Sequence, residues 1–269
     1  MISNMTDVKI TKDVIYDPTH QLPTDIYTTE VVTAQSPAII IIHGGGWFRG
    51  DKSKESDLAE ILAEEGYFTI VPNYRLAPKD LFPASRDDIE TVYTWLKHSD
   101  YTFNHSKIAA VGASAGGNLS GELALKFGIP AVSWSGIFDL YDWVTKHPDV
   151  VAEPDTKQDA TVLASAQIDQ DGAHDAFYKW FVLNYVNGDL DQLKEADPIQ
   201  RVSAKSGPIY FANSLNELVP ISGVQKMQDA LSQAGVPTIS QYLTGARHGK
   251  AYQADVLNNT LDFFKKALQ

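Results

Sequence analysis

The sequence predicts one α/β domain in which a mostly parallel central sheet of about eight strands carries helices on both faces. Predicted strands and helices alternate along most of the chain, as they do in parallel sheets. Residues 38–42 form a continuous aliphatic run, which is typical of a central strand covered on both faces. Glycine-rich turns follow this run and the apolar run at 107–112, at the strand ends where open α/β sheets bind ligands.

Each element follows from its local pattern. The first two strands are expected to begin the sheet in antiparallel fashion, and glycine or capping signals mark several helix ends. The predicted strands cover 7–16, 24–32, 38–43, 67–72, 107–112, 130–135, 208–213 and 238–243. The predicted amphipathic helices cover 53–65, 86–98, 115–127, 222–234 and 255–268.

Length and composition indicate a single domain spanning 1–269, without an internal linker. No apolar tract is long enough to cross a membrane, and the first twenty residues lack the apolar core of a secretory signal, so we expect a cytoplasmic protein. The absence of cysteine excludes disulfides and cysteine-bound metals. A net charge of −12 without a basic cluster argues against nucleic-acid binding and mildly disfavours anionic substrates.

Ser114 is the candidate nucleophile. It lies in the pentapeptide 112–116, Gly-Ala-Ser-Ala-Gly, between a predicted strand and a predicted helix. A serine on so sharp a turn is strained and needs small neighbours, which this segment supplies. The helix that follows directs its N–H groups and positive dipole end at the serine, which favours a developing anion. The pentapeptide alone also fits a glycine-rich helix entry with an incidental serine, but the flanking strand and helix favour a nucleophile.

A glycine loop about seventy residues earlier supplies the second half of an acyl-transfer site. Consecutive glycines allow backbone conformations that turn N–H groups toward an oxyanion. The loop begins with His43, which we expect to be structural rather than a base, and ends with Trp47, which we expect to line the site or pack beneath it. The candidate oxyanion donors are the backbone N–H groups of Gly44, Gly45, Gly46 and Ala115.

The two motifs, in this order and at this distance, resemble those of α/β-hydrolases of the hormone-sensitive-lipase-like esterase group. They are also similar to the HGGxW kynurenine formamidases. Further matches are TDIY at 24–27 to the family's LDVY strand, NYRLAP at 73–78 with FPA at 82–84 and Asp88 to its YRLAP…FPA…D segment, and SGIFDL at 135–140 to its SGxxDL stretch. The resemblance covers nearly the whole chain and is weakest between about 141 and 195. It implies an α/β-hydrolase fold with a serine nucleophile and leaves the substrate open.

The stretch from about 140 to 195 is rich in aromatic residues and aspartates, and it follows the strand after the nucleophile helix, where this fold commonly inserts a cap. We expect a small helical cap there, within the single domain. Such a cap would shape an acyl or aryl pocket and exclude water, although most of its aromatic side chains would only anchor it to the body. The candidate substrate contacts are Trp47, Trp143 and Tyr178.

His248 is the expected general base. It lies in a turn after the last predicted strand and before the last helix, which is where the resembled family delivers its base. The chain order of serine, acid and histidine also agrees. The alternative is an exposed loop histidine without a role. A base at this position predicts that turnover rises with pH as the imidazole loses its proton.

The acid is expected on the loop after the strand at 208–213. Members of the family often have Asp three residues before the valine of a Val-Pro pair, but Asn216 occupies that position here and Glu217 follows it. An amide can orient an imidazole but cannot stabilise its cation by charge, and such a replacement costs roughly 10⁴ in turnover. We therefore expect Glu217 to be the acid, with Asn216 as a supporting residue or the alternative.

These residues predict a serine carboxylesterase that acts on small esters, such as short-acyl, acetyl-sugar or aryl esters. It would need no cofactor and no metal, and its partner would be the small-molecule ester rather than nucleic acid or a membrane; a homo-oligomer is left open. Two alternatives remain. One is an arylformamidase or amidohydrolase of the kynurenine formamidase type, which uses the same machinery. The other is a ligand-binding homologue without catalysis, as in the plant gibberellin receptors.

Overall fold

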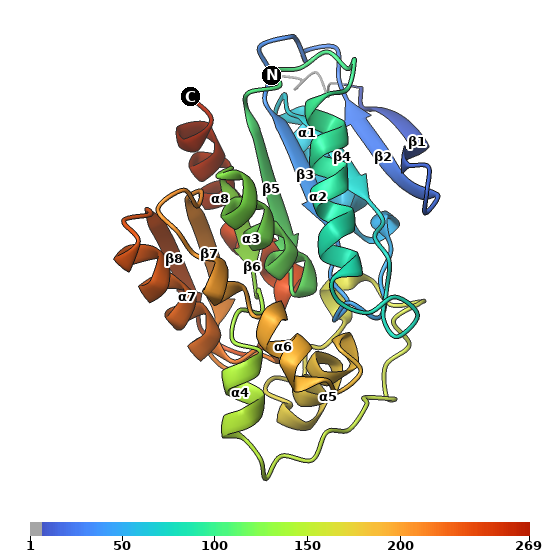
Figure 1. Ribbon diagram of the computed structural model, residues 1–269. Coiled ribbons are helices and arrows are strands. Elements are labelled where there is room, and N and C mark those ends of the chain that lie inside the picture. The colour runs from blue at the N-terminus through green and yellow to red at the C-terminus, as the bar shows by residue number, and fades with distance from the viewer. Residues whose placement is uncertain (1–6) are drawn as a thin grey trace.

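The computed structural model describes residues 7–269. Its centre is one sheet of eight strands in the order β1-β2-β4-β3-β5-β6-β7-β8, with helices on both faces (Figure 1). Pairs β1–β2 and β2–β4 are antiparallel, and all other pairs are parallel. The strands are β1 Lys9–Asp17, β2 Leu22–Thr28, β3 Ala38–Ile42, β4 Phe68–Pro72, β5 Ile108–Ala113, β6 Ala131–Trp134, β7 Ile209–Ser214 and β8 Thr238–Leu243. The predicted mostly parallel α/β sheet is confirmed.

Alternate residues of the central strand β3 serve the two faces of the sheet. Ile40 and Ile42 share one core with helices α2 and α3, whereas Ile39 and Ile41 share a second core with α1 and α8. This division explains why the strand is aliphatic at every position. The principal helices are α1 Ser56–Glu64, α2 Ala84–Lys97, α3 Ala115–Phe127, α7 Ile221–Gln233 and α8 Gln253–Ala267.

Predicted and observed elements differ mainly at their ends. The second strand was expected to run to residue 32, but β2 stops at Thr28 because the chain turns there, with the Val32 N–H donating to the Thr29 carbonyl at 3.2 Å. Helix α2 begins two residues earlier than expected, at Ala84. None of the helices within residues 7–269 has the length and apolarity needed to cross a membrane.

Three short helices form the cap at the carboxyl ends of the parallel strands (Figure 1). They are α4 Tyr141–Lys146, α5 Asp175–Tyr185 and α6 Leu190–Ala196. Between α4 and α5 the chain is mostly extended, and its regular structure is limited to the 3₁₀ turn η2 Ser165–Gln167. We call residues 147–174 the strap. The expected cap is thus helical at both ends, while its middle lacks the expected helices because few of its residues find an apolar surface to pack on.

Candidate active site

Ser114 occupies the turn between β5 and α3 with a left-handed backbone, at φ 57° and ψ −122°. A non-glycine residue pays for such a conformation with strain, which the surroundings must hold in place. Two hydrogen bonds do so, because Ser114 N donates to the Trp134 carbonyl at 2.8 Å and Asn118 N donates to the Ser114 carbonyl at 3.0 Å. The serine is therefore fixed at the N-terminus of a helix, where the dipole favours negative charge.

Two glycines allow this turn to sit against the sheet. A Cβ on Gly116 would overlap the carbonyl oxygen of Ile42 in β3, and a Cβ on Gly112 would overlap the backbone of Gly116. Helix α3 thus crosses the strands in direct backbone contact, which a larger residue would prevent. The small residues around Ser114 in the sequence are explained by this close approach.

The glycine loop lies directly against the serine turn. A Cβ on Gly44 would lie 2.8 Å from the Ala113 carbonyl and 3.4 Å from the Ser114 Cβ. Gly45 follows with φ 120°, and its carbonyl accepts a hydrogen bond from Arg49 N at 3.1 Å, so the loop is a closed turn rather than a flexible segment. Both glycines line the cavity that contains Ser114.

The four candidate oxyanion donors are not equivalent. Ala115 begins α3 directly after Ser114, and Gly44 and Gly45 border the cavity. Gly46 does not border it; the space beside its Cα is occupied by the rings of Phe48 and Phe181. Gly44 and Gly45 thus border the cavity, whereas Gly46 and Ala115 do not line it, although Ala115 directly follows Ser114.

His248 and Glu217 are in direct contact. The Glu217 Oε2 lies 2.5 Å from His248 Nδ1, and both side chains are buried. The other carboxylate oxygen accepts hydrogen bonds from Ser214 N at 2.9 Å and from Asn213 Nδ2 at 3.3 Å. A carboxylate held by two donors besides the imidazole can orient that imidazole with little freedom.

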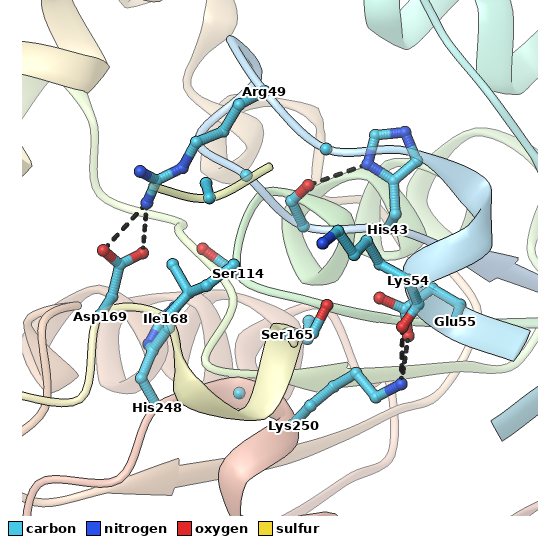
Figure 2. A pocket seen from close by; sticks show the side chains of 16 residues that line it. His43, Arg49, Lys54, Glu55, Ser114, Ser165, Ile168, Asp169, His248 and Lys250 are labelled. Atoms are coloured by element: carbon cyan, nitrogen blue, oxygen red, sulfur yellow. Dashed lines mark hydrogen bonds and ion pairs between the residues drawn. The ribbon is translucent and has the colours of Figure 1, made fainter. Parts of the chain in front are cut away.

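The electrostatics of His248 suit a base. Burial lowers its pKa, but the hydrogen bond and the charge of Glu217 outweigh burial, so the pKa lies above the ordinary value of 6.5. Its Nε2 is buried and has no hydrogen-bond partner among the described residues. The imidazole lines the same cavity as Ser114 (Figure 2), so this nitrogen is available to a proton there.

Asn216 lies apart from this pair. Its side chain is exposed, and its backbone N–H donates to the Gly245 carbonyl at 3.0 Å. The strand β7 ends at Ser214, and the turn that follows directs residue 217 rather than residue 216 back toward the base. The structure brings Glu217, and not Asn216, to the imidazole.

The cavity at Ser114 is small, with a volume of about 60 Å³, and its walls carry several charges. Figure 2 shows Arg49 paired with Asp169 on one side of Ser114 and Lys250 paired with Glu55 on the other. Burial raises the pKa of Glu55 to about 7, although Lys250 opposes the shift. The lining residues are His43, Gly44, Gly45, Arg49, Gly50, Lys54, Glu55, Ala113, Ser114, Ala160, Ser165, Ile168, Asp169, His248, Gly249 and Lys250.

Sequence reasoning missed the charged lining residues. In the sequence, Glu55 and Lys250 read as members of amphipathic or turn segments, and Asp169 as one acid of an acidic stretch. Their burial depends on segments nearly two hundred residues apart. The one local signal was their position: Arg49 follows the glycine loop and Lys250 follows His248 by two residues.

The three aromatic residues expected at the substrate lie elsewhere. Trp47 is buried and stacks on Tyr185 with ring centroids 4.3 Å apart, and Trp143 packs edge-on against Tyr178 at 4.6 Å. None of the three lines the cavity at Ser114, so the structure does not bring them to the proposed substrate position. They bury large apolar rings between cap and body, which anchors the cap.

His43 has the structural role expected of it. Its ring stacks on Tyr74 at 4.2 Å, and its Nδ1 donates to the Gly44 carbonyl at 2.8 Å. Burial lowers the pKa of His43 to about 4, so the ring is neutral at ordinary pH. A neutral donor to a carbonyl of the glycine loop helps to fix the conformation of that loop.

Several known proteins similar to this chain are named as esterases. The carboxylesterase NlhH of Mycobacterium tuberculosis is 32% identical over 174 residues, which cover 62% of this chain and 51% of NlhH. The versiconal hemiacetal acetate esterase of Aspergillus parasiticus is 30% identical over 130 residues, covering 47% of this chain and 40% of that enzyme. The chain's match thus spans about half the length of the curated relatives.

Solved structures show the same fold. An esterase of Pyrobaculum calidifontis superposes with a TM-score of 0.75 at 20% identity, covering 97% of this chain and 86% of that one. A truncated carbohydrate esterase from gut microbiota superposes with a TM-score of 0.74 at 18% identity, covering 98% of both chains. The resemblance to α/β-hydrolase esterases is confirmed by these matches.

The family model described as BD-FAE matches residues 24–231, a range that contains the glycine loop, Ser114, the cap and Glu217. His248 lies beyond the matched range, on the turn that the fold brings back to Ser114. The match covers well over half of the sequence. This chain therefore belongs to the BD-FAE family.

Proposed function

We propose that this protein is a serine carboxylesterase that hydrolyses small esters through Ser114, His248 and Glu217. The observation that carries the proposal is the convergence of three separate segments on one cavity. A strained serine at a helix N-terminus, a glycine loop packed on its backbone and a buried imidazole held by a carboxylate all border that space. This is the arrangement that acyl transfer to a serine requires.

In the proposed reaction, Nε2 of His248 takes the proton of the Ser114 hydroxyl, and the serine oxygen attacks the ester carbonyl. The carbonyl oxygen gains negative charge, which the N–H groups of Gly44, Gly45 and Ala115 stabilise; each such donor is worth about 10²–10³ in rate. Glu217 stabilises the imidazolium by charge. The imidazolium then gives its proton to the departing alcohol, which leaves an acyl-serine.

Water completes the cycle by the same steps. His248 takes a proton from a water molecule, the hydroxide attacks the acyl carbonyl, and the ester bond to Ser114 breaks. The proton returns to the serine oxygen and the carboxylic acid leaves. Because His248 must be neutral to act as base, and its pKa lies above 6.5, the proposed activity rises with pH through that range.

The size of the cavity supports a short acyl group. The volume of about 60 Å³ is small, and the charged side chains of Arg49, Glu55 and Asp169 interrupt its wall, which suits a short acyl group better than a long alkyl chain. One relative is described as an acetate esterase and one structural neighbour as a carbohydrate esterase. We therefore infer that the substrates are acetyl or similarly short acyl esters. Their alcohol component would be a sugar or an aryl alcohol.

The test is hydrolysis of p-nitrophenyl acetate, butyrate and octanoate by the wild type and by Ser114→Ala. We expect turnover to fall as the acyl chain lengthens and to be lost in the variant. Equal turnover of acetate and octanoate would refute the short-acyl class. Turnover that survives Ser114→Ala would refute the mechanism. If none of the three esters shows Ser114-dependent turnover, formylkynurenine is the next substrate to measure.

A further inference from the structure

One short part of the strap contacts three of the four segments that carry the proposed catalytic groups: the glycine loop, the acid loop and the base loop. In residues 169–172, Asp169 lines the cavity at Ser114, and Asp169 and Gln170 follow each other directly in the sequence while binding different loops. Asp169 has a left-handed backbone, at φ 59°. The chain turns sharply there, and the side chains of Asp169 and Gln170 bind different loops. We call residues 169–172 the clasp.

Asp169 binds the glycine loop. Nη2 of Arg49 donates to its two carboxylate oxygens at 2.9 and 2.8 Å, and both side chains are mostly buried. The guanidinium also lies 5.0 Å from the centroid of the Phe48 ring. Because Arg49 N closes the turn at the Gly45 carbonyl, this ion pair links the strap to the loop that holds the proposed oxyanion donors.

Gln170 binds the base loop through both ends of its amide. Oε1 accepts a hydrogen bond from His248 N at 2.8 Å, and Nε2 donates to the His248 carbonyl at 3.0 Å. Nε2 also donates to the Ile168 carbonyl at 2.7 Å, which fixes the amide on the strap. The paired bonds hold the peptide groups on both sides of the His248 Cα, and therefore set the direction of its side chain.

Gly172 packs on the acid loop. It has φ 89°, and a Cβ at this position would lie 3.1 Å from the Asn216 carbonyl and 3.4 Å from the Ala246 Cβ. The body holds the base loop from the opposite side, because Gly249 N donates to Ser135 Oγ at 2.8 Å. The base is therefore held between the body and the clasp.

We propose that Gln170 is a positioning residue for the catalytic base, and that the clasp makes the activity of His248 depend on closure of the strap. The proposal rests on the proposed function of Ser114 and His248. When the strap is seated, the bidentate amide holds Nε2 toward Ser114; when it lifts, the base loop loses its hydrogen bonds on the cap side. Seating of the strap would then cover the substrate and align His248 in the same step.

The test compares Gln170→Ala with Gln170→Glu and with the control Gln167→Ala. Gln167 lies on the same strap, is exposed, and binds only the Ala164 N–H within the strap. With p-nitrophenyl acetate we expect Gln170→Ala to lower kcat by about 10- to 100-fold with KM little changed, since a small misplacement of a catalytic group has that effect. Gln167→Ala should stay within about twofold of the wild type on the same principle.

The glutamate variant separates positioning from general loosening. Its carboxylate can still accept from His248 N, but its second oxygen faces the His248 and Ile168 carbonyls, to which the amide donates, so kcat should fall at least as far as in the alanine variant. The charges already facing the imidazole are those of Glu217, Asp169 and Arg49. An added carboxylate beside them stabilises the imidazolium, so the pH at which activity reaches half its maximum should rise.

A second readout does not need turnover. The proton in the Glu217–His248 hydrogen bond should give a far-downfield proton resonance, assigned by its loss in His248→Gln. We expect this resonance to broaden or vanish in Gln170→Ala and to persist in Gln167→Ala. A persistent resonance together with unchanged kcat in Gln170→Ala would overturn the inference while leaving the esterase proposal intact. If turnover survives Ser114→Ala, the proposed function fails, and the resonance alone decides whether Gln170 orients the imidazole.

Discussion

The two sides of the cavity at Ser114 are built by different means. On the sheet side, β3, β5 and α3 meet in backbone contact, and Gly112 and Gly116 leave no space for a side chain. On the strap side, regular structure is nearly absent, and the contacts are made by side chains. These contacts are the ion pair of Arg49 with Asp169, the bonds of Lys54 to the Thr161 and Leu163 carbonyls, and the bonds of Gln170 to His248.

The two sides of the cavity should therefore differ in how well they tolerate substitution. Backbone contact fixes the serine and the glycine loop relative to each other. No side chain can be added at Gly112 or Gly116 without moving the strands. Side-chain contacts across the strap can be lost one at a time while the fold remains. We expect a change on the sheet side to disrupt the fold together with the reaction, and a change on the strap side to alter activity while the fold remains.

The largest effect is expected at Glu217, whose carboxylate is held by the end of β7. Glu217→Gln keeps the shape but removes the charge, so turnover should fall by roughly 10⁴. The pKa of His248 should also fall, because Glu217 is what raises it, and the remaining activity should begin at lower pH. The measurement is kcat against pH. Asn216→Ala is the matched control, and a comparable loss in that variant would refute the assignment of the acid.

A substitution at Gly116 tests the backbone frame directly. Gly116→Ala places a Cβ on the Ile42 carbonyl, so strands and helix must separate. We expect the free energy of unfolding to fall by about 3 kcal/mol, at the upper end of overpacking effects, with loss of turnover. Gly235→Ala is the control, because Gly235 has a positive φ of 76° and open space beside it, so its loss reports backbone strain without a steric contact. Denaturant unfolding of both variants provides the comparison, and a loss in Gly116→Ala no larger than that in the control would refute the steric contact with Ile42 as the cause.

Glu55 tests whether a buried charge weakens the sheet side at high pH. Its pKa is raised from 4.5 to about 7, so its favourable contribution to folding is complete below pH 4.5 and is lost as the pH rises to about 7. Glu55→Gln should abolish this loss and gain about 1–3 kcal/mol on the wild type between pH 5 and 8. Lys250 keeps a partner in the variant, because it also pairs with Asp57. The measurement is denaturant unfolding of the wild type and Glu55→Gln at pH 5 and pH 8. The same difference in free energy of unfolding at both pH values would contradict the prediction.

The smallest effect is expected from the ion pair across the cavity. Arg49→Ala, Asp169→Ala and the double variant form a cycle in which the coupling should be about 1 kcal/mol, as for a partly exposed bidentate pair. The strap side should tolerate each variant, with the protein still folded and kcat lowered by less than in Gln170→Ala. The cycle is measured by thermal unfolding at low and high salt. A coupling that does not weaken at high salt would indicate that the pair is less accessible than its exposure implies.

Prediction from the sequence succeeded where a local residue pattern is itself required by the backbone geometry at that position. The aliphatic run of β3 and the small residues around Ser114 have one structural explanation each, and both were found at the predicted positions. The sequence could not tell which aromatic residues of the cap contact substrate, because a ring that packs within the cap or against the body has the same sequence signature as one that contacts substrate. Trp143 and Tyr178 proved to pack on each other.

The sequence by itself therefore determined the α/β fold, the turn that carries Ser114, the glycine loop, and the candidates for base and acid. These depend on patterns within a few residues, such as strand hydrophobicity and glycine spacing. Only the tertiary structure decided that Glu217 rather than Asn216 meets His248, that Glu55 and Lys250 are buried at the cavity, and that Gln170 holds the base. Those contacts join segments that are remote in the sequence, and no local pattern records which polar side chain a folded chain will bury.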